Sequence, residues 1–433
     1  MVRNRCKYGW TALALASSIT HAAECAPPVP ALMQGAPIPA GMLVTVSNMM
    51  QAPYNRWAFH HVRQLQPSSE VSRGEGAPSQ LAEFPVDLDA LDFRIGDNSK
   101  VSLDAWLKES CTDAFLVLHK GRIVYERYFN EMAPTSEHLM CSVTKSFVST
   151  MTLDLIDQGR IDPTRLLQSY LPELAHSAFG DATVQQVLDM TTSLTFSEDY
   201  ADPQADIWKY ALSLSPADMV PAAYQGPRTI YDYLPTLKKA ATAHGYGFHY
   251  VTPNADVLAW LNHRVSGQTA SSLLSETVWQ KLGAERDAYF SIASAGTELT
   301  GGGLNMTARD AARFGQMILQ RGQYNGQAVL PEAVAARILQ PSISETFGRL
   351  YDEPWYGETT YAYHDMWWTF NNPHKAISAI GINGQFIYID PVAELVVVKQ
   401  SSHPDAESEI NDVIGPQIWY QIATYLMQQK VTP

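Results

Sequence analysis

The protein has 433 residues and a formal net charge of −14 at pH 7, because 44 Asp and Glu residues outnumber 30 Lys and Arg residues. Hydrophobic residues make up 46% of the chain and charged residues only 17%, which is typical of a globular rather than a disordered protein. The acidity argues against nucleic-acid binding and against a basic membrane-surface patch, since both need clustered Lys and Arg. The length allows roughly two to four domains, or one large domain with an insertion.

The first residues predict an export signal. Three basic residues precede an apolar stretch at 10–19, and small residues follow at Ala22-Ala23, which is the pattern of a cleavable signal peptide. The apolar stretch is about ten residues long, too short to cross ~30 Å of hydrocarbon. We therefore predict a signal peptide over 1–22, no membrane span, and a periplasmic or secreted mature protein.

Three cysteines, Cys25, Cys111 and Cys141, remain after the predicted cleavage. Their number is odd, and no CxxC spacing indicates a zinc site. An oxidising compartment permits one disulfide, for example between Cys25 and Cys111, but the sequence does not determine the pairing. Cys141 would then be a small buried residue.

Residues 23–105 are rich in Pro, Gly and Ser and have weak periodicity. We expect them to form an extension that wraps the main body, 106–433. In the body, two strands at 113–129 flank a tight turn, a mostly helical region follows at about 160–340, and strands return at 375–400. The pattern predicts an α+β fold, in which one antiparallel sheet is flanked by helices and interrupted by an inserted, mostly helical region. The expected helices lie at 142–158, 182–190, 255–265, 277–282, 307–320 and about 407–427.

The main chemical feature is the tetrad Ser142-Val-Thr-Lys145. On a helix, positions i and i+3 share a face, so the hydroxyl and the amine can meet. A serine at a helix N-terminus is close to unpaired N–H groups and to the positive end of the helix dipole. Serine needs an adjacent base to become a nucleophile, and a buried lysine can lose its proton. The alternative is an exposed lysine beside a helix-capping serine, since such a tetrad arises by chance about once in a chain of this size.

Two further segments support a catalytic interpretation of the tetrad. They are 248–254, which contains Tyr250, and 381–385, with the sequence Gly-Ile-Asn-Gly-Gln. With them the sequence resembles the serine β-lactamase-like hydrolases, which include class C β-lactamases and penicillin-binding proteins. It is most similar to the 6-aminohexanoate-dimer (nylon oligomer) hydrolases, over about 40–425. The resemblance implies a β-lactamase/transpeptidase-like fold. Further similar segments lie at 55–57, 188–192, 198–200 and 301–310.

The resemblance implies that Ser142 attacks a substrate carbonyl and becomes acylated. Lys145 and Tyr250 would accept its proton, and Tyr250 would pass one to the leaving group. The ordinary tyrosine pKa of about 10 is too high for an efficient base, so the Lys145 charge is expected to lower it. The backbone N–H groups of Ser142 and Gln385 would form the oxyanion hole, and Gly384 would let the strand approach closely.

Tyr200, Asn383 and Trp368 are the expected substrate-contacting residues. Three of the assigned residues have simpler alternatives: Trp368 and Tyr250 as core aromatics, and Gly384 as part of a hairpin turn. His60-His61 and His364-Asp365 lack ligand spacing, so we expect no metal and no cofactor.

Two departures from the family pattern bear on the substrate. Ile382 occupies the position of the lysine in the Lys-Thr-Gly motif, which helps to bind the β-lactam carboxylate, and Thr252 replaces the asparagine of the class C Tyr-x-Asn motif. Both changes favour small linear amides or esters as substrates. The alternatives are a β-lactamase or D-Ala-D-Ala carboxypeptidase, and a non-catalytic binding protein on the same fold. Oligomeric state is not readable from the sequence.

Overall fold

The computed structural model describes most of the chain beyond the predicted signal peptide. The described residues are 25, 31–95, 99–216, 219–293, 295–342, 347 and 361–429. Residues 1–22 lie outside them, so the signal peptide stays a prediction. No helix in the described ranges is long and apolar enough to cross a membrane.

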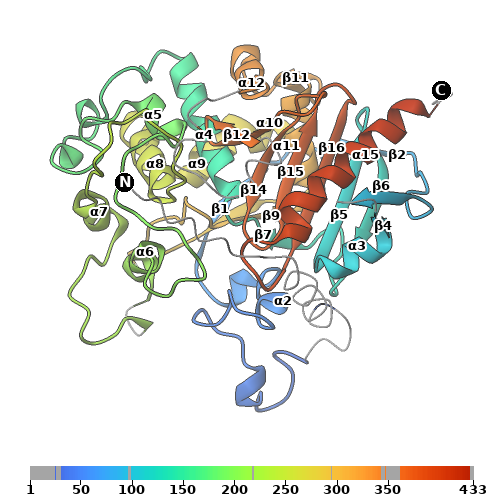
Figure 1. The fold of residues 1–433 in the computed structure, drawn as a ribbon, viewed down its shortest axis with the longest axis horizontal. Helices are drawn as coiled ribbons and strands as arrows, with labels where there is room; N and C mark the ends of the chain where they lie inside the picture. Colours follow the sequence, from blue (N-terminus) through green and yellow to red (C-terminus); the bar gives the residue numbers. More distant parts are fainter. Residues whose placement is uncertain are drawn as a thin grey trace, which may run out of the picture.

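An eight-stranded sheet forms the centre of the molecule (Figure 1). The strands β5 and β16 pair antiparallel, with Leu395 opposite His119, which confirms the prediction that the early hairpin joins the late strands. Every neighbouring pair is antiparallel except β2 and β6. In sheet order the strands are β12 (Tyr361–His364), β13 (Trp367–Phe370), β14 (Ile377–Gly381), β15 (Gln385–Asp390), β16 (Leu395–Ser401), β5 (Thr112–His119), β6 (Arg122–Tyr128) and β2 (Ala82–Glu83).

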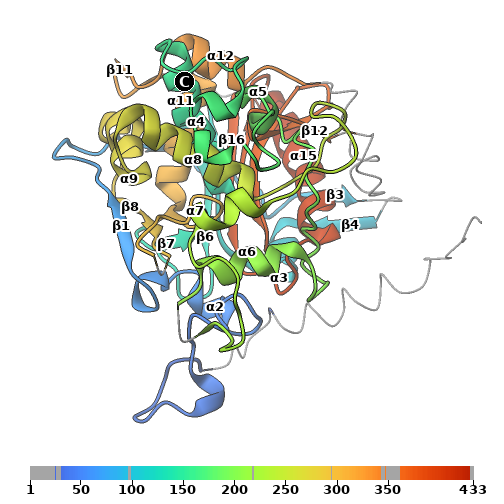
Figure 2. The ribbon, with the colours of Figure 1, turned by 90° about the vertical axis from the view of Figure 1, so that its left-hand side faces the viewer.

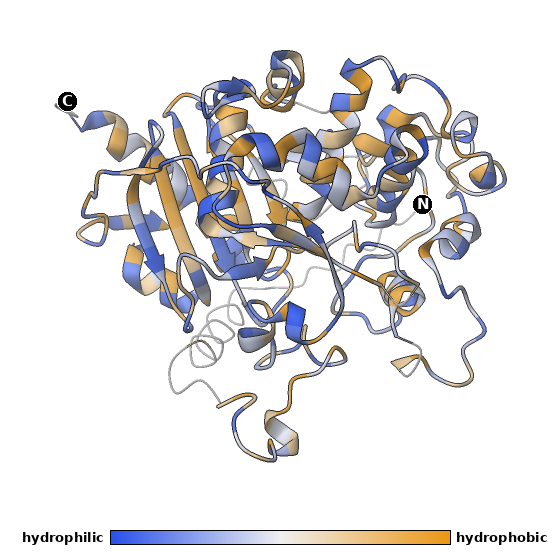
Figure 3. Cartoon of the chain, turned by 180° about the vertical axis from the view of Figure 1, so that it is seen from behind, coloured by the Kyte–Doolittle hydropathy of each residue, from blue (hydrophilic) through white to orange (hydrophobic). Residues whose placement is uncertain are grey.

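Helices cover both faces of this sheet. On one face, Trp419 of α15 (Gly415–Gln428) packs against Phe386 and Tyr388 of β15. On the other, α4 (Val143–Asp157) and α11 (Ala308–Leu319) contact the strands. Burial on both faces explains why β15 and β16 are continuous apolar runs rather than alternating ones (Figure 3).

The middle of the chain forms the expected helical region beside the sheet (Figure 1). Two strands of this region pair with two earlier strands in a four-stranded sheet that was not predicted from the sequence. In sheet order its strands are β1 (Ser68–Val71), β8 (Ala288–Ser291), β9 (Leu304–Thr307) and β7 (Glu137–Leu139). Thr307 caps α11 through the Asp310 N–H, as its spacing predicts. The other α-helices of this region, within the described residues, are α5 (Val184–Leu188), α6 (Asp206–Leu214), α7 (Ile230–Tyr233), α8 (Pro253–Ser266), α9 (Ala270–Leu274), α10 (Gln280–Leu282) and α12 (Glu332–Ile338). The two-stranded pairs are β3 (Asp92–Ile95) with β4 (Ser99–Ser102), and β10 (Gln323–Tyr324) with β11 (Gln327–Ala328). These elements together confirm the α+β class.

The N-terminal part of the described chain packs along the body (Figures 1 and 2). Phe59 and Val62, which follow α2 (Asn55–Ala58), belong to a small apolar cluster with Leu139 and Tyr289 of the body. Strand β1 adds to the four-stranded sheet beside β8. Helix α3 (Leu103–Glu109) runs across position 105, where the sequence predicts the end of the extension.

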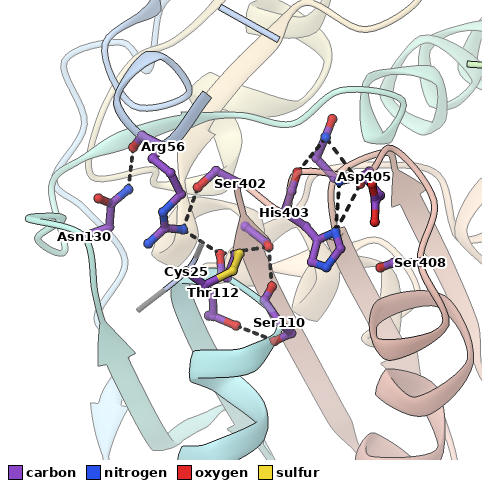
Figure 4. The surroundings of a disulfide bond; sticks show 12 residues. Cys25, Arg56, Ser110, Thr112, Asn130, Ser402, His403, Asp405 and Ser408 are labelled. Carbon is purple, nitrogen blue, oxygen red and sulfur yellow. Dashed lines mark hydrogen bonds between the residues drawn. A yellow bond between two sulfur atoms is a disulfide. The ribbon is translucent and has the colours of Figure 1, made fainter. Parts of the chain in front are cut away.

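A disulfide joins Cys25 to Cys111, with a Cα–Cα distance of 5.0 Å. This is the pairing that the sequence allowed but left open. The Cys111 carbonyl accepts hydrogen bonds from Arg56 Nη1 at 3.0 Å and from Ser401 Oγ at 2.9 Å (Figure 4). Cys141 is free and buried, as expected. The bridge therefore ties the N-terminal segment to the start of β5 beside the end of β16.

Candidate active site

Ser142 and Lys145 meet at the start of α4. Ser142 is the N-cap residue, and its predecessor Cys141 has a φ of 46°, which turns the chain sharply into the helix. Lys145 Nζ donates a hydrogen bond of 2.8 Å to Ser142 Oγ and one of 2.6 Å to the Gly301 carbonyl. Ser142 is 8% exposed and Lys145 is 1% exposed. The lysine is therefore held against the hydroxyl, not extended into solvent.

Burial changes the proton affinity of Lys145. Desolvation lowers its pKa from 10.5 to about 8, opposed by the negative charges of Glu198 and Asp256. Asp256 is itself buried, which raises its pKa to about 6, and it accepts hydrogen bonds from Tyr210 Oη at 2.8 Å and Thr300 Oγ1 at 2.7 Å. A lysine with a pKa near 8 has an appreciable neutral fraction at neutral pH, so it can act as a general base.

Tyr250 lies beside Lys145, just before α8. Its ring centroid is 5.2 Å from Lys145 Nζ. The ring stacks on Trp368 with centroids 5.8 Å apart and an interplanar angle of 22°, and meets Tyr363 edge-on at 6.0 Å. The aromatic neighbours fix the plane of the phenol. The structure thus places the three residues of the predicted catalytic set around one point.

These residues border two adjoining cavities. The inner cavity, of about 60 Å³, contains Ser142 and Trp368 in its wall, and the outer cavity, of about 990 Å³, contains Asn383. Both are lined by Glu198, Tyr200, Tyr250, Ile382, Ala406 and Glu407. A reacting carbonyl at Ser142 would therefore lie in the smaller cavity, where it adjoins the larger one.

The expected substrate-contacting residues lie in these walls. Tyr200 borders both cavities and donates a hydrogen bond of 2.7 Å to Glu198 Oε1. Trp368 borders the inner cavity, which fits the pocket-wall interpretation rather than a purely core role. Asn383 is 3% exposed, and its Nδ2 donates to the His403 carbonyl at 2.8 Å. Asn383 thus supports the wall formed by the segment after β16.

The predicted oxyanion role of Gly384 and Gln385 does not fit the structure. Neither lines the inner or the outer cavity. Gly384, with a φ of 87°, lies in the turn after β14, and a Cβ there would lie 2.9 Å from Asn411 Oδ1. Gln385 Nε2 donates to the Ser401 carbonyl inside the sheet. The hairpin turn, which was the simpler alternative for Gly384, is the observed role.

The close approach to Ser142 is made instead by Gly381, at the end of β14. A Cβ on Gly381 would lie 2.5 Å from the Met140 carbonyl oxygen and 2.9 Å from the Ser142 nitrogen. The next residue, Ile382, lines both cavities. The motif contains two glycines, and only the strand register shows which of them faces the serine. Gly381 and Ile382, rather than Gly384 and Gln385, therefore lie at the cavity that contains Ser142.

The sequence analysis also missed two carboxylates near Lys145. Asp256 lies in the first turn of α8, a position where acidic residues are common for helix stability alone. Glu198 is on a loop without regular spacing to any motif. The segment 198–200 resembles the family, but only Tyr200 in it was assigned a role, and Asp256 gave no signal of function.

Other titratable clusters do not form a metal centre. No group of three or more His, Cys, Asp or Glu side chains in the described ranges could hold a metal ion. His364 Nδ1 lies 3.0 Å from Asp365 Oδ2, and burial lowers the pKa of His60 to about 3. The contact with Asp365 explains the position of the His364 ring, and burial explains the lowered pKa of His60.

Substitution of Gly381 by Ala is expected to reduce hydrolysis by about 100-fold or more, the effect of disturbing an oxyanion donor. The added Cβ cannot be accommodated unless β14 moves away from Ser142. Initial rates, with the melting temperature as a check of folding, measure this. The matched control is Gly41→Ala, where a Cβ meets nothing within 4 Å. Equal rates for Gly381→Ala and the unmodified protein would contradict the assignment.

Comparison with known proteins agrees with this geometry. The Beta-lactamase family model matches residues 111–413. The 6-aminohexanoate-dimer hydrolase of Paenarthrobacter ureafaciens is 37% identical over 378 residues, which cover 84% of this chain and 89% of that protein. A solved structure from Bacillus anthracis, provisionally named a 6-aminohexanoate-dimer hydrolase, superposes with a TM-score of 0.79 at 32% identity, over 88% of this chain and 97% of the other.

More distant structures share the fold. A penicillin-binding protein homologue from Pyrococcus abyssi has a TM-score of 0.56 at 17% identity, over 76% of each chain. The matched region contains the Ser142-Lys145 tetrad, Tyr250 and the strand that ends at Gly381. The chain is therefore a hydrolase that belongs to the beta-lactamase family.

Proposed function

We propose that this protein is an exported serine hydrolase that cleaves small linear amides or esters through an acyl-enzyme on Ser142. The observation that carries the proposal is the 2.8 Å hydrogen bond between Lys145 Nζ and Ser142 Oγ, at a cavity that Tyr250 also lines. Export rests on the signal-like N-terminus.

The first half of the reaction forms the acyl-enzyme. Neutral Lys145 takes the proton from Ser142 Oγ as the oxygen bonds to the substrate carbonyl carbon. The N–H groups of Ser142 and Ile382 stabilise the resulting oxyanion. As the tetrahedral intermediate collapses, Tyr250 gives its phenol proton to the leaving nitrogen or oxygen and regains a proton from the Lys145 ammonium. The bond from the carbonyl carbon to the leaving group breaks, and the acyl group stays on Ser142.

The second half releases the acid. Tyr250 and Lys145 accept a proton from water as its oxygen attacks the acyl carbon. Collapse of this second intermediate breaks the bond to Ser142 Oγ, which regains a proton. The same pair of residues thus acts as base in one direction and as acid in the other.

Two features favour linear amides or esters over penicillins. Because Gly381 is the glycine that faces Ser142, the basic position of the third motif corresponds to Ala379 and not, as the sequence predicted, to Ile382. Ala379 also carries no charge that would bind a β-lactam carboxylate. The described residues that line the inner cavity include Glu198, Glu407 and Asp412 but no Lys or Arg. A substrate carboxylate close to the scissile bond would meet like charges there. The name of the Paenarthrobacter relative, a 6-aminohexanoate-dimer hydrolase, is consistent with a linear substrate.

A substrate screen with detection of the acylated peptide tests this proposal. We expect purified protein to hydrolyse linear amides or esters faster than nitrocefin, and acid-quenched samples to contain a Ser142 peptide heavier by the acyl group. Ser142→Ala should give neither product nor mass shift. Turnover by Ser142→Ala would overturn the mechanism, whereas rapid nitrocefin hydrolysis would favour a β-lactamase.

A further inference from the structure

A loop carboxylate, Glu198, is bound to the segment that carries Tyr250. Glu198 Oε2 accepts the Thr252 backbone N–H at 2.7 Å, and Oε1 accepts the Thr252 hydroxyl at 2.5 Å. Oε1 also accepts the Tyr200 hydroxyl at 2.7 Å. One carboxylate therefore joins the loop at 198–200 to a residue 54 positions further along the chain.

These contacts place Glu198 at the N-terminus of α8. Thr252 is the N-cap residue of α8, but its side chain makes no capping hydrogen bond. The first N–H groups of a helix have no partner within the helix and attract negative charge. Glu198 therefore satisfies, from a distant loop, the backbone N–H of the N-cap residue itself. The next helical N–H group, that of Asn254, donates to the Val251 carbonyl.

The position of α8 matters because Tyr250 is two residues before Thr252. The intervening Val251 is fully buried, so a fixed position of Thr252 also restricts where the Tyr250 phenol can lie. Glu198 and Tyr200 both line the two cavities. The hydrogen bonds of Glu198 thus connect the wall of the cleft to the residue that we expect to transfer protons.

Glu198 also acts electrostatically on Lys145. Its negative charge raises the pKa of Lys145, against the larger effect of burial. The other groups that face Lys145 are Asp256 from α8, Cys141 from the turn before α4, and the ring of Tyr250. Asp256 contributes in the same direction as Glu198.

We propose that Glu198 is a positioning residue of the hydrolytic site, which holds Tyr250 in place through Thr252, while Tyr200 binds the same carboxylate. The proposal rests on the proposed serine-hydrolase function. It assigns to a non-motif loop residue the role of fixing the second motif, in a chain where that motif has Thr252 rather than asparagine.

Two variants separate the positional from the electrostatic effect. Glu198→Gln keeps the size and shape of the side chain. It removes the negative charge and replaces one of the two acceptor oxygens by an amide NH2 group. We expect kcat to fall about 10- to 100-fold, KM to change less, and the ascending limb of the pH–kcat/KM profile to move to lower pH. Thr252→Val removes the hydrogen bond from the threonine hydroxyl to Glu198 but keeps the Glu198 charge. We therefore expect kcat to fall while the ascending limb of the pH–kcat/KM profile stays at the same pH.

The control is Glu173→Gln, which removes an exposed carboxylate paired with Arg264. It should change neither kcat nor the pH of the ascending limb. Melting temperatures of all variants monitor folding. If Glu198→Gln does not fold, Thr252→Val decides the positional role alone, because an unchanged kcat there would overturn it. An unchanged kcat and pH limb in folded Glu198→Gln would overturn the whole inference. Failure of the unmodified protein to acylate Ser142 would instead overturn the proposed function.

Discussion

Replacement of Lys145 by Met is expected to abolish hydrolysis and at the same time to raise the stability of the folded protein at pH 7. The variant loses the base that contacts Ser142 Oγ, and we expect turnover to fall at least about 1,000-fold. The stability gain follows from burial: a pKa lowered from 10.5 to about 8 corresponds to a penalty of about 3 kcal/mol for keeping the cation buried. Methionine fills a similar volume without a charge.

The pH dependence of this effect has a definite sign. The folded-state pKa of Lys145 is below the unfolded value, so between about pH 8 and 10.5 the unfolded chain binds more protons. The stability of the unmodified protein therefore rises with pH in that range, and the advantage of Lys145→Met should shrink. The same pKa predicts an ascending limb of kcat/KM near pH 8 in the unmodified enzyme.

Hydrolysis rates and melting temperatures of Lys145→Met and the unmodified protein, at pH 7 and pH 9.5, measure the loss of turnover and the gain in stability. The control is Lys108→Met, an exposed lysine whose ion pair with Asp104 should contribute little. Retained turnover by Lys145→Met would contradict the proposed role of Lys145. A lower melting temperature at pH 7 would contradict the burial argument.

Replacement of Arg56 by Leu is expected to destabilise the protein by about 3–5 kcal/mol, the usual cost of breaking a buried ion pair. Arg56 Nη1 lies 2.8 Å from Asp113 Oδ1, and the two side chains are 6% and 0% exposed. Arg56 also donates to Ser402 Oγ at 2.8 Å (Figure 4). The substitution leaves the Asp113 charge buried without its main counter-charge, and it loosens the N-terminal segment from the sheet.

Acidification should reduce this difference. Arg56 and His138 hold the pKa of Asp113 at about 2 despite its burial. The stability that this ionised carboxylate contributes is present above its unfolded pKa of 3.8 and is lost as the pH falls toward 2. Without Arg56, the Asp113 pKa rises, and protonation removes the buried charge at a higher pH.

Urea unfolding at pH 7 and pH 4.5 measures the loss. Arg321→Leu is the matched control, since the Arg321–Glu332 pair is exposed and 3.7 Å long, and it should change stability by less than about 1 kcal/mol. The double substitution Arg56→Leu with Asp113→Leu should recover part of the loss. A single Arg56→Leu variant as stable as the control would show that the buried pair does not anchor the segment.

Elements with strong short-range signals were predictable. The helix that begins after Ser142 and the capped helix α11 follow from apolar spacing and capping residues. The strands β14 to β16 follow from their apolar runs and the turn between them. The four-stranded sheet was missed because its strands have only three or four residues each, and β1 pairs with β8 across about half of the chain.

By itself, the sequence predicted that Ser142 and Lys145 share one face at a helix start, and its resemblance to the serine β-lactamase-like hydrolases added Tyr250 to them. It also indicated one sheet built from both ends of the chain. Only the tertiary structure decided that Gly381 rather than Gly384 approaches Ser142, and that Glu198 and Asp256 act on Lys145. The physical reason is range: helical spacing is set by neighbouring residues, whereas close approaches and buried charges depend on where distant segments pack.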